Sequence, residues 1–369
     1  MPTESTRILI VGGGVAGLLL ARRLAHRNPI VLGGTSFPAA SRVAAGILNP
    51  VTGRRFSLLP GFAAYRDAAR ETYRAIPGGD RCFRETTLRR FFLDPAEIER
   101  FESRRRDPGF EPFLGPREKP GSGGLPVADP HGSFRIHGVA QVDLPPLLDR
   151  IRADLGGLYR DVDADWSTLE ADDDGFRLNG IRTRHLVSCD GAGVRTNPLF
   201  RWLPFRPVRG ETLTVRLSGI ADLPEILHHS KWIAPLGAHR FRIGSTYQRP
   251  PGTGKRAEAP GVPVPAAPTT EGKAELLDAC RRIFPGETDP EILDHRAGVR
   301  PCTRDNAPYL GRHPLHPLAW ICNGLGSKGA LYAPLLARRL ADAIENDVPP
   351  DPALDPGRVV RKGFPARIG

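Results

Sequence analysis

Three glycines near the N-terminus have the spacing of a turn that binds phosphate. Gly12, Gly14 and Gly17 follow the apolar run 7–11 and precede the apolar run 18–25. Gly12 permits a tight turn, Gly14 lets the backbone approach a pyrophosphate, and Gly17 lets the following helix pack closely on the strand. The phosphate then faces free N–H groups at the positive end of that helix. The pattern predicts a dinucleotide-binding site at the start of the chain.

The second strand of this unit ends without the acidic residue that such sites usually contain. An Asp or Glu about 20 residues after the glycines normally binds the ribose hydroxyls. Here Leu32 is followed by Gly33, Gly34, Thr35 and Ser36, none of which carries a carboxylate. A hydroxyl of Thr35 or Ser36, or a backbone group, could bind the ribose instead. The residue that contacts the ribose is therefore left open.

Strand and helix patterns continue along the chain and would position these residues. The sequence predicts strands at 7–11, 29–32, 185–189, 212–217, 232–235 and 240–246, and helices at 18–25, 60–76 and 142–155. Residues 107–133 are rich in Pro and Gly and are expected to be irregular. Residues 250–270, with six prolines, are expected to form a solvent loop. The strand–helix–strand order around the glycines indicates a parallel α/β unit.

Composition narrows the class of protein. The chain has 369 residues with 40% hydrophobic and 25% charged residues, which excludes a disordered chain. It carries 52 Lys+Arg against 41 Asp+Glu, a formal charge of +11. Between Arg81 and Lys119 ten basic residues alternate with eight acidic ones, so no linear basic patch marks a nucleic-acid site. We interpret the charge as a solvated, Arg-rich surface.

The cysteines and the N-terminal residues indicate the cellular compartment in which the protein works. The five cysteines are odd in number and form no C-x-x-C pair, so neither a disulfide framework nor a zinc site is expected. Nothing before Arg7 resembles a signal peptide. The apolar run 8–21 is shorter than the roughly 20 residues that cross a bilayer. The sequence predicts a cytoplasmic protein with no metal site and no membrane segment.

Seven segments in family order resemble the D-amino-acid-oxidase-like superfamily of FAD enzymes, and the glycine oxidases most closely. They are 12–17, 41–48, 189–193, 206–210, 241–246, 298–311 and 323–330, and they span nearly the whole chain. The most specific segment begins Gly298-Val-Arg-Pro and ends at Gly311. Residues 323–334 are also similar to the flavin domain of the bifunctional tRNA wobble-uridine modification enzyme.

The resemblance implies an α/β fold in which a Rossmann-like FAD-binding domain is interleaved with an antiparallel-sheet substrate domain. The FAD-binding domain is expected at 1–76, 137–200 and 296–369, and the substrate domain at 77–136 and 201–295. FAD would be held noncovalently. The residues expected to bind it lie at the first glycine turn, in the small-residue loop 41–48 and at two later glycine turns: Gly12, Gly14, Val15, Ala16, Gly17, Ser41, Arg42, Ala44, Ala45, Gly46, Gly191, Gly324, Gly326, Ser327, Lys328 and Gly329.

Three residues are expected to take part in the chemistry. Arg300 occupies the Gly-x-Arg-Pro position that binds the substrate carboxylate in glycine-oxidase-type enzymes, and its guanidinium matches a carboxylate bidentately. Lys328 would add positive charge near the flavin or attract superoxide; the alternative is a surface Lys. Trp232 departs from the family pattern, which has a Tyr there to help hold the carboxylate, so the identity of the substrate is open.

Four further residues have a functional and a structural interpretation. Tyr247, His228 and His229 are additional candidates from the substrate domain, although histidines of this kind are more often structural. Cys302 lies near the position where some relatives attach FAD covalently, but the local spacing differs. A buried, inert thiol is the simpler interpretation.

These observations favour one function and leave others open. The first is oxidation of a small amine or amino acid to an imine, with transfer of a hydride to FAD and oxygen as the expected acceptor. A dehydrogenase with another electron acceptor, and an enzyme that removes a carboxymethyl group from a tRNA wobble uridine, are the alternatives. A flavin-binding sensor without catalysis fits least, because Arg300 is retained. The oligomeric state is not indicated.

Overall fold

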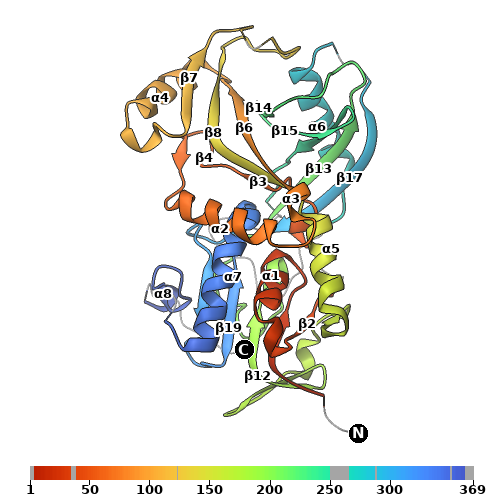
Figure 1. The fold of residues 1–369 in the computed structure, drawn as a ribbon, viewed down its shortest axis with the longest axis vertical. Coiled ribbons are helices and arrows are strands. Elements are labelled where there is room, and N and C mark those ends of the chain that lie inside the picture. The colour runs from red at the N-terminus through yellow and green to blue at the C-terminus, as the bar shows by residue number, and fades with distance from the viewer. Residues whose placement is uncertain are drawn as a thin grey trace.

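The computed structural model describes residues 4–34, 39–122, 124–249, 266–286, 289–349 and 351–361. Within them the chain forms two large sheets, which lie one above the other in Figure 1. The predicted solvent loop at 250–270 falls mostly outside the described residues.

The first sheet contains the predicted dinucleotide unit. Its eight strands are β1 (Ser5–Val11), β2 (Ile30–Leu32), β9 (Tyr159–Arg160), β10 (Glu170–Asp172), β11 (Gly175–Leu178), β12 (Ile181–Ser188), β18 (Tyr309–Arg312) and β19 (Ala319–Asn323). The central strand β1 pairs in parallel with β2 and β12, and β9 extends the parallel part beyond β2. Parallel strands bring their carboxyl ends to one edge, where ligands bind in such sheets.

Both faces of this sheet are covered, which explains the nearly continuous apolar run of β1. Ile8 and Ile10 pack with the helices α1 (Val15–Arg23), α5 (Leu144–Leu155) and α7 (Gly329–Asn346) in one cluster. Leu9 and Val11 face a second cluster on the opposite side. Figure 1 shows α1, α5 and α7 beside each other in the lower half of the molecule.

The second sheet lies above the first and forms a roof over its carboxyl edge (Figure 1). Its nine strands are β3 (Ile47–Leu48), β6 (Phe83–Phe91), β7 (Leu114–Glu118), β8 (Ser133–Val142), β13 (Val208–Arg216), β14 (Ile226–His228), β15 (Trp232–Gly237), β16 (Arg240–Gly244) and β17 (Glu291–Arg300). All neighbouring strands pair antiparallel except β6 and β14, which are parallel.

Smaller elements complete the chain. The helices are α2 (Phe62–Arg74), α3 (Gly79–Cys82), α4 (Pro95–Arg105), α6 (Thr270–Ile283) and α8 (Gly357–Val360), and β4 (Val51–Thr52) pairs with β5 (Ser57–Leu58). Helix α6 covers the outer face of the second sheet through a cluster that contains Leu213, Phe241 and Leu276. Among the described residues, no helix combines the length and apolar character needed to cross a membrane.

Most expected elements are present, with small shifts at their ends. Helix α5 begins after Asp143, which the sequence also places at its N-cap. The region 107–133 is more regular than expected, because it contains β7, which pairs with β8 directly after this region. Two expected domain boundaries, at residues 137 and 296, fall inside β8 and β17. The division into domains stays a prediction.

Candidate active site

A single elongated cavity of about 1200 Å³ contains most of the predicted site residues. At one end it is lined by Gly33 and Gly34, which follow β2, and at the other by Trp232 and Arg300 of the second sheet. Between these ends the cavity passes the glycine turn after β1. It therefore joins the predicted nucleotide site to the predicted substrate site.

The three glycines of the first turn have different structural roles. Gly12 has a φ of +120° and lies against the backbone of Cys189, so a side chain there would meet the Asp190 nitrogen at 2.8 Å. A side chain at Gly17 would overlap the Gly12 carbonyl oxygen. A side chain at Gly14 would instead have its nearest neighbours at 3.7 Å and would extend into the cavity that Gly14 lines. Gly14 is thus the glycine that leaves space for a ligand.

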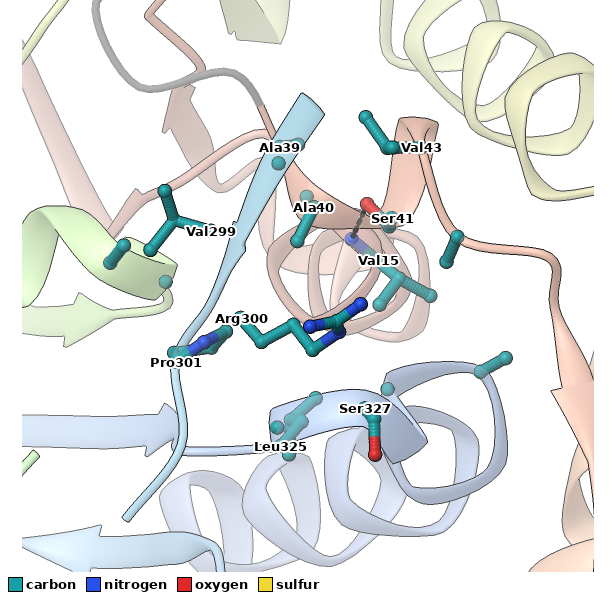
Figure 2. Close-up of a pocket in the computed structure, with 18 of the residues that line it drawn as sticks. Val15, Ala39, Ala40, Ser41, Val43, Val299, Arg300, Pro301, Leu325 and Ser327 are labelled. Atoms are coloured by element: carbon teal, nitrogen blue, oxygen red, sulfur yellow. Dashed lines mark hydrogen bonds between the residues drawn. The ribbon is translucent and has the colours of Figure 1, made fainter. Parts of the chain in front are cut away.

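The loop that contains Ser41 closes one side of this turn. The backbone N–H of Val15, in the first turn of α1, donates to Ser41 Oγ at 3.3 Å, as Figure 2 shows. Gly46 has a φ of +67°, and a side chain there would overlap the Val142 carbonyl of β8. Val15, Ala16, Ser41, Ala44, Ala45 and Gly46 all line the cavity. Small side chains here allow a flat ring system to lie close to the backbone.

Arg300 is held at the end of β17 and lines the cavity. Its Nη2 donates to Ser245 Oγ at 2.6 Å and to the Thr246 carbonyl at 3.4 Å. Its Nη1 is buried and has no hydrogen-bond partner among the described residues. Burial lowers the pKa of Arg300, while Cys302 and Tyr247 have the opposite effect. In Figure 2 the side chain lies between the 39–43 segment and the turn at Leu325 and Ser327.

A glycine makes room for this guanidinium. Gly210 of β13 lies directly beneath it, and a side chain at that position would meet the Arg300 Cζ at 2.5 Å. The Arg300 guanidinium also lies 5.7 Å from the ring centroid of Tyr247, which lines the cavity but is 61% exposed. Ser245 and Gly210 lie in two of the segments that resemble the family, but no role was predicted for them, because only the folded sheet brings them to Arg300.

Trp232 lies on the cavity face of β15. Its ring covers Gly244 of the neighbouring strand, where a side chain would meet Trp232 Cζ2 at 2.5 Å. His228 lies opposite Trp232 on β14, and Arg90 lies opposite His228 on β6. All three line the cavity. The roof of the cavity therefore consists of the Trp232 ring and, behind it, a polar region formed by His228 and Arg90.

The charges in this polar region are balanced within the protein. Arg90 donates to the Gly53 carbonyl at 2.8 Å and to the Glu97 carboxylate at 3.2 Å, and Glu97 is fully buried. Burial, with Arg90 nearby, lowers the pKa of His228 to about 3. His228 is therefore neutral near pH 7, and its Nδ1 has no hydrogen-bond partner among the described residues. His229 does not line the cavity and lies near the ring of Phe91.

The last glycine turn lies at the start of α7. Gly326, Ser327, Lys328 and Gly329 line the cavity where this helix begins. Lys328 is half-buried, and burial lowers its pKa while nearby Cys302 raises it. Its Nζ lies 5.9 Å from the ring centroid of Tyr332. The helix N-terminus and Lys328 together give this wall a positive potential.

A buried carboxyl lies where β12 ends. Asp190 accepts hydrogen bonds from Ser188 Oγ at 2.6 Å, Asn197 Nδ2 at 3.1 Å and Asn323 Nδ2 at 3.0 Å. Burial raises the pKa of Asp190 to about 6, although these hydrogen bonds oppose the shift. Asp190 lines the cavity together with Gly191. Of these two residues, only Gly191 was predicted from the sequence to bind the cofactor.

Three residues predicted to bind the cofactor do not line the cavity. Gly17 lies against Gly12, and a side chain at Gly324 would meet Thr303 Cγ2 at 2.5 Å. Arg42 forms an ion pair with Asp149 at 2.6 Å. Their direct contact with the cofactor stays a prediction. Cys302 also lies outside the lining, and burial raises the pKa of its thiol.

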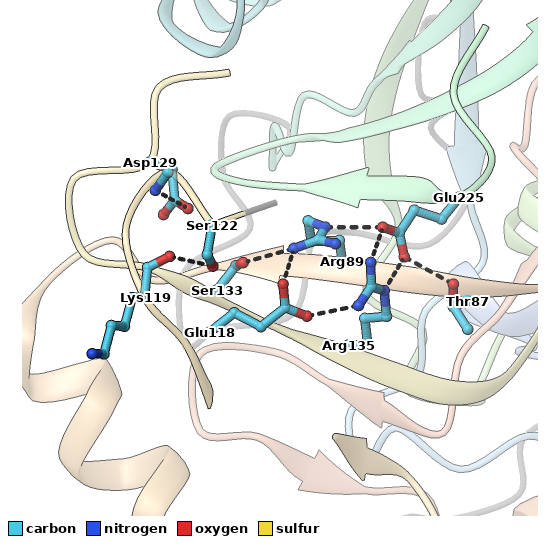
Figure 3. A network of polar contacts seen from close by, with 10 residues as sticks. Thr87, Arg89, Glu118, Lys119, Ser122, Asp129, Ser133, Arg135 and Glu225 are labelled. Atoms are coloured by element: carbon cyan, nitrogen blue, oxygen red, sulfur yellow. Dashed lines mark hydrogen bonds and ion pairs between the residues drawn. The ribbon is translucent and has the colours of Figure 1, made fainter. Parts of the chain in front are cut away.

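A network of ion pairs supports the roof from its other face (Figure 3). Arg89, which is next to Arg90 on β6 and points the opposite way, donates to Glu118 at 2.5 Å and to Glu225 at 2.9 Å. Arg135 of β8 bonds to the same two carboxylates. Arg89 and Glu225 are almost fully buried, and the network links β6, β7, β8 and the residue before β14.

The cavity fits FAD on structural grounds. Gly14 leaves open space beside the start of α1, where phosphate groups bind. The small residues of the 39–46 loop and the positive start of α7 form the walls where a flavin ring would lie. At the roof, Arg300 lines the cavity and brings a positive charge to it. When bound, FAD supplies the acceptor for a hydride.

Comparison with known proteins gives the same cofactor. The model of the family described as FAD dependent oxidoreductase matches residues 7–343. A glycine oxidase from Pseudomonas aeruginosa is 28% identical over 390 residues, which covers 95% of this chain and 97% of that protein. The crystal structure of glycine oxidase from Geobacillus kaustophilus has a TM-score of 0.77 and 21% identity, and each chain is covered completely.

A second kind of relative is longer than this chain. A tRNA 5-methylaminomethyl-2-thiouridine biosynthesis bifunctional protein from a Caulobacter species is 27% identical over 371 residues. The match covers 93% of this chain but 55% of that protein. The family match spans both sheets and the cavity between them. The chain therefore belongs to the family of FAD dependent oxidoreductases, and its cofactor is FAD.

Proposed function

We propose that the protein oxidises the C–N bond of a small amine or amino acid that carries a carboxylate. The observation that carries this proposal is Arg300, whose buried Nη1 has no partner among the described residues and whose Nη2 is fixed by Ser245. A fixed, desolvated guanidinium binds a carboxylate strongly and in one orientation. The similarity to glycine oxidase along the whole chain supports the same substrate class.

The residues of the cavity would each contribute to the reaction. Arg300 would hold the carboxylate, and Trp232 would cover the substrate and keep water from the reacting carbon. The start of α7 and Lys328 line the opposite wall of the cavity. There they would stabilise the negative charge that a bound flavin gains with the hydride. The neutral amine is the reactive form, since its lone pair assists loss of the hydride. The imine product then reacts with water to give a carbonyl compound and a free amine.

Two residues near the cavity support noncovalent binding of FAD and oxygen as the electron acceptor. Cys302 has a thiol whose pKa is raised by burial, which disfavours the thiolate needed for a covalent link. Lys328, half-buried beside the start of α7, would attract superoxide during reoxidation. We therefore propose oxygen as the acceptor, with a quinone or carrier protein as the alternative.

A direct test is reduction of the bound flavin without oxygen. Glycine, sarcosine, D-amino acids, iminodiacetate and undermodified tRNA are added separately, and loss of the oxidised-flavin absorbance is followed. We expect at least one carboxylate-bearing amine to reduce the flavin and hydrogen peroxide to form when oxygen is readmitted. Reduction without reaction with oxygen would indicate a dehydrogenase, and no reduction by any amine would refute the proposal.

A second candidate is modification of a tRNA wobble uridine. The similarity to the bifunctional tRNA protein along 93% of this chain favours it, and so does the charge of +11. Such a substrate also carries an amine with a carboxylate, so Arg300 would suit it. Flavin reduction by undermodified tRNA, with no reduction by any small amine, would support this candidate over the first.

A further inference from the structure

The end of β2 has an unusual arrangement. The two residues that follow Leu32 are Gly33 and Gly34, at the place where dinucleotide-binding sheets normally have an acidic side chain for the ribose. The space beside Gly34 is not empty. A side chain at Gly34 would overlap Oδ1 of Asp163 and would come within 2.7 Å of its Cγ. Asp163 therefore places a carboxylate where a side chain of residue 34 would begin.

This carboxylate comes from the segment that follows the strand next to β2. Strand β9 pairs with β2 in parallel, so that Leu32 is opposite Arg160. The ladder continues past both strands, because the Gly33 N–H donates to the Arg160 carbonyl at 2.8 Å and the Gly34 N–H donates to the Val162 carbonyl at 3.0 Å. Asp163 follows directly, and its backbone is aligned with the end of β2.

The backbone of Asp163 is also held from the other side. Asn179 Nδ2 donates to the Asp163 carbonyl at 2.8 Å, and the Asp165 N–H donates to Asn179 Oδ1 at 2.8 Å. Asn179 lies in the turn between β11 and β12, with a φ of +50°. Two independent sets of hydrogen bonds thus fix the segment that carries the carboxylate.

The glycines are explained by the same arrangement. A side chain at Gly33 would meet the ring of Tyr159 from β9, at 2.5 Å from Cε2. At both positions, then, side chains from the β9 segment fill the space that β2 leaves. Gly33, Gly34 and Asp163 line the cavity together, at the end where Ala164 and Trp166 complete its wall.

The position relative to the phosphate turn is also suitable. The Gly12 N–H donates to the Leu32 carbonyl at 2.8 Å, so the end of β2 lies beside the turn. A ribose attached to a pyrophosphate at Gly14 would therefore lie near the end of β2. An ionised carboxylate only accepts hydrogen bonds, and its two oxygens suit two vicinal hydroxyls.

We propose that Asp163 binds the hydroxyls of the adenosine ribose of FAD, as a replacement, from the segment after β9, for the missing acidic residue at the end of β2. The proposal rests on the FAD site and does not depend on the substrate that we propose. It also implies discrimination, because a carboxylate at this place would repel a phosphate group on the ribose.

The test compares FAD, which contains the adenosine ribose, with a flavin that lacks this ribose. The apoprotein is titrated with FAD and with FMN, which has no adenosine, and binding is followed by the quenching of flavin fluorescence. We expect Asp163→Ala to weaken FAD binding by roughly 10- to 150-fold, the effect of losing hydrogen bonds to a charged group. The affinity for FMN should be unchanged. Asp163→Asn keeps one acceptor oxygen, so its affinity for FAD should lie between those of the unchanged protein and Asp163→Ala.

A matched control and a second measurement keep the test decisive. Asp161 is an exposed carboxylate two residues earlier that pairs with Arg152, and Asp161→Ala should leave FAD binding unchanged. With the unchanged protein, an FAD analogue whose adenosine lacks both ribose hydroxyls should bind at least about 10-fold more weakly than FAD. Equal affinity for FAD and this analogue would overturn the proposal, and so would equal losses of FAD and FMN affinity in Asp163→Ala.

Discussion

The Arg300 guanidinium is bonded to Ser245 and the residue lines the cavity, and this geometry makes a quantitative prediction. Arg300→Lys keeps the charge but loses the planar fork, so one charge-assisted hydrogen bond to the carboxylate disappears. The loss should cost about 1.5–3 kcal/mol, which is a 10- to 150-fold fall in the efficiency of flavin reduction. Stopped-flow reduction without oxygen measures it, and Arg300→Ala should be slower still.

The control for Arg300 is a substrate without the carboxylate. The decarboxylated amine should reduce the flavin of the variant and of the unchanged protein at nearly the same rate. FAD content should also be unchanged, since the phosphate turn lies elsewhere in the cavity. If the rate of flavin reduction falls equally with both substrates, or if FAD is lost, Arg300 has a structural role and does not bind the carboxylate.

Asp190 makes stability depend on pH. Its pKa is raised to about 6 in the folded protein, mainly by burial, so between about pH 4 and 6 the folded state keeps a proton that the unfolded state releases. The free energy of unfolding therefore falls as the pH rises through this range. At about 1.4 kcal/mol per pKa unit, the Asp190 contribution is at most about 3 kcal/mol.

Comparison with Asp190→Asn isolates this effect from other groups. The stability of the variant relative to the unchanged apoprotein should increase from pH 4 to 7 by up to about 3 kcal/mol, as measured by urea unfolding. A relative stability that is constant over this range would show that the carboxyl titrates normally. Other carboxyl groups, such as Glu225 with its lowered pKa, affect both proteins equally.

In the unit formed by β1, the glycine turn and α1, different glycines are needed for folding and for cofactor binding. Gly14→Val should give a folded apoprotein that does not bind FAD, because the side chain enters the space for the pyrophosphate. Gly17→Ala should instead destabilise the apoprotein by about 1–3 kcal/mol, because its methyl group overlaps the Gly12 carbonyl. Thermal unfolding and FAD titration of both variants would distinguish them. Loss of folded protein in Gly14→Val would contradict this division.

The ion-pair network behind the roof makes a prediction about stability alone. Arg89→Met leaves the buried Glu225 with a half-exposed partner, Arg135, and should lower the free energy of unfolding by about 3 kcal/mol. Arg135→Met is the matched control, and its effect should be smaller because this side chain is 40% exposed. Neither variant should change the affinity for FAD. A larger effect for Arg135→Met would show that the network is not centred on Arg89.

Local patterns in the sequence were sufficient for the first nucleotide-binding unit. The apolar run of β1, the three glycines and the start of α5 after Asp143 depend on neighbours in sequence, and each is present in the structure. Asp163 could not be found in this way, because it is 129 residues from Gly34 and the two meet only through the pairing of β2 with β9. The pairing of β7 with β8 was missed because turn residues surround both strands.

At the scale of the whole molecule, the two sheets form one cavity between them. The first sheet contributes the phosphate turn and the positive start of α7, while the second contributes Arg300 and Trp232. The order of these residues in the chain does not indicate which of them face each other. Arg90 and His228 illustrate this, because they are neighbours only through the parallel pairing of β6 with β14.

The most direct test of the proposed reaction is the product balance of a single turnover without oxygen. The FAD-loaded protein is mixed with the amine that reduces it fastest, and the reduced flavin, the carbonyl product and the released amine or ammonia are quantified. Oxidation of the C–N bond predicts one carbonyl compound and one released amine or ammonia for each flavin reduced. Reduction of the flavin with no release of amine or ammonia, or reduction only by the corresponding hydroxy acid, would contradict it.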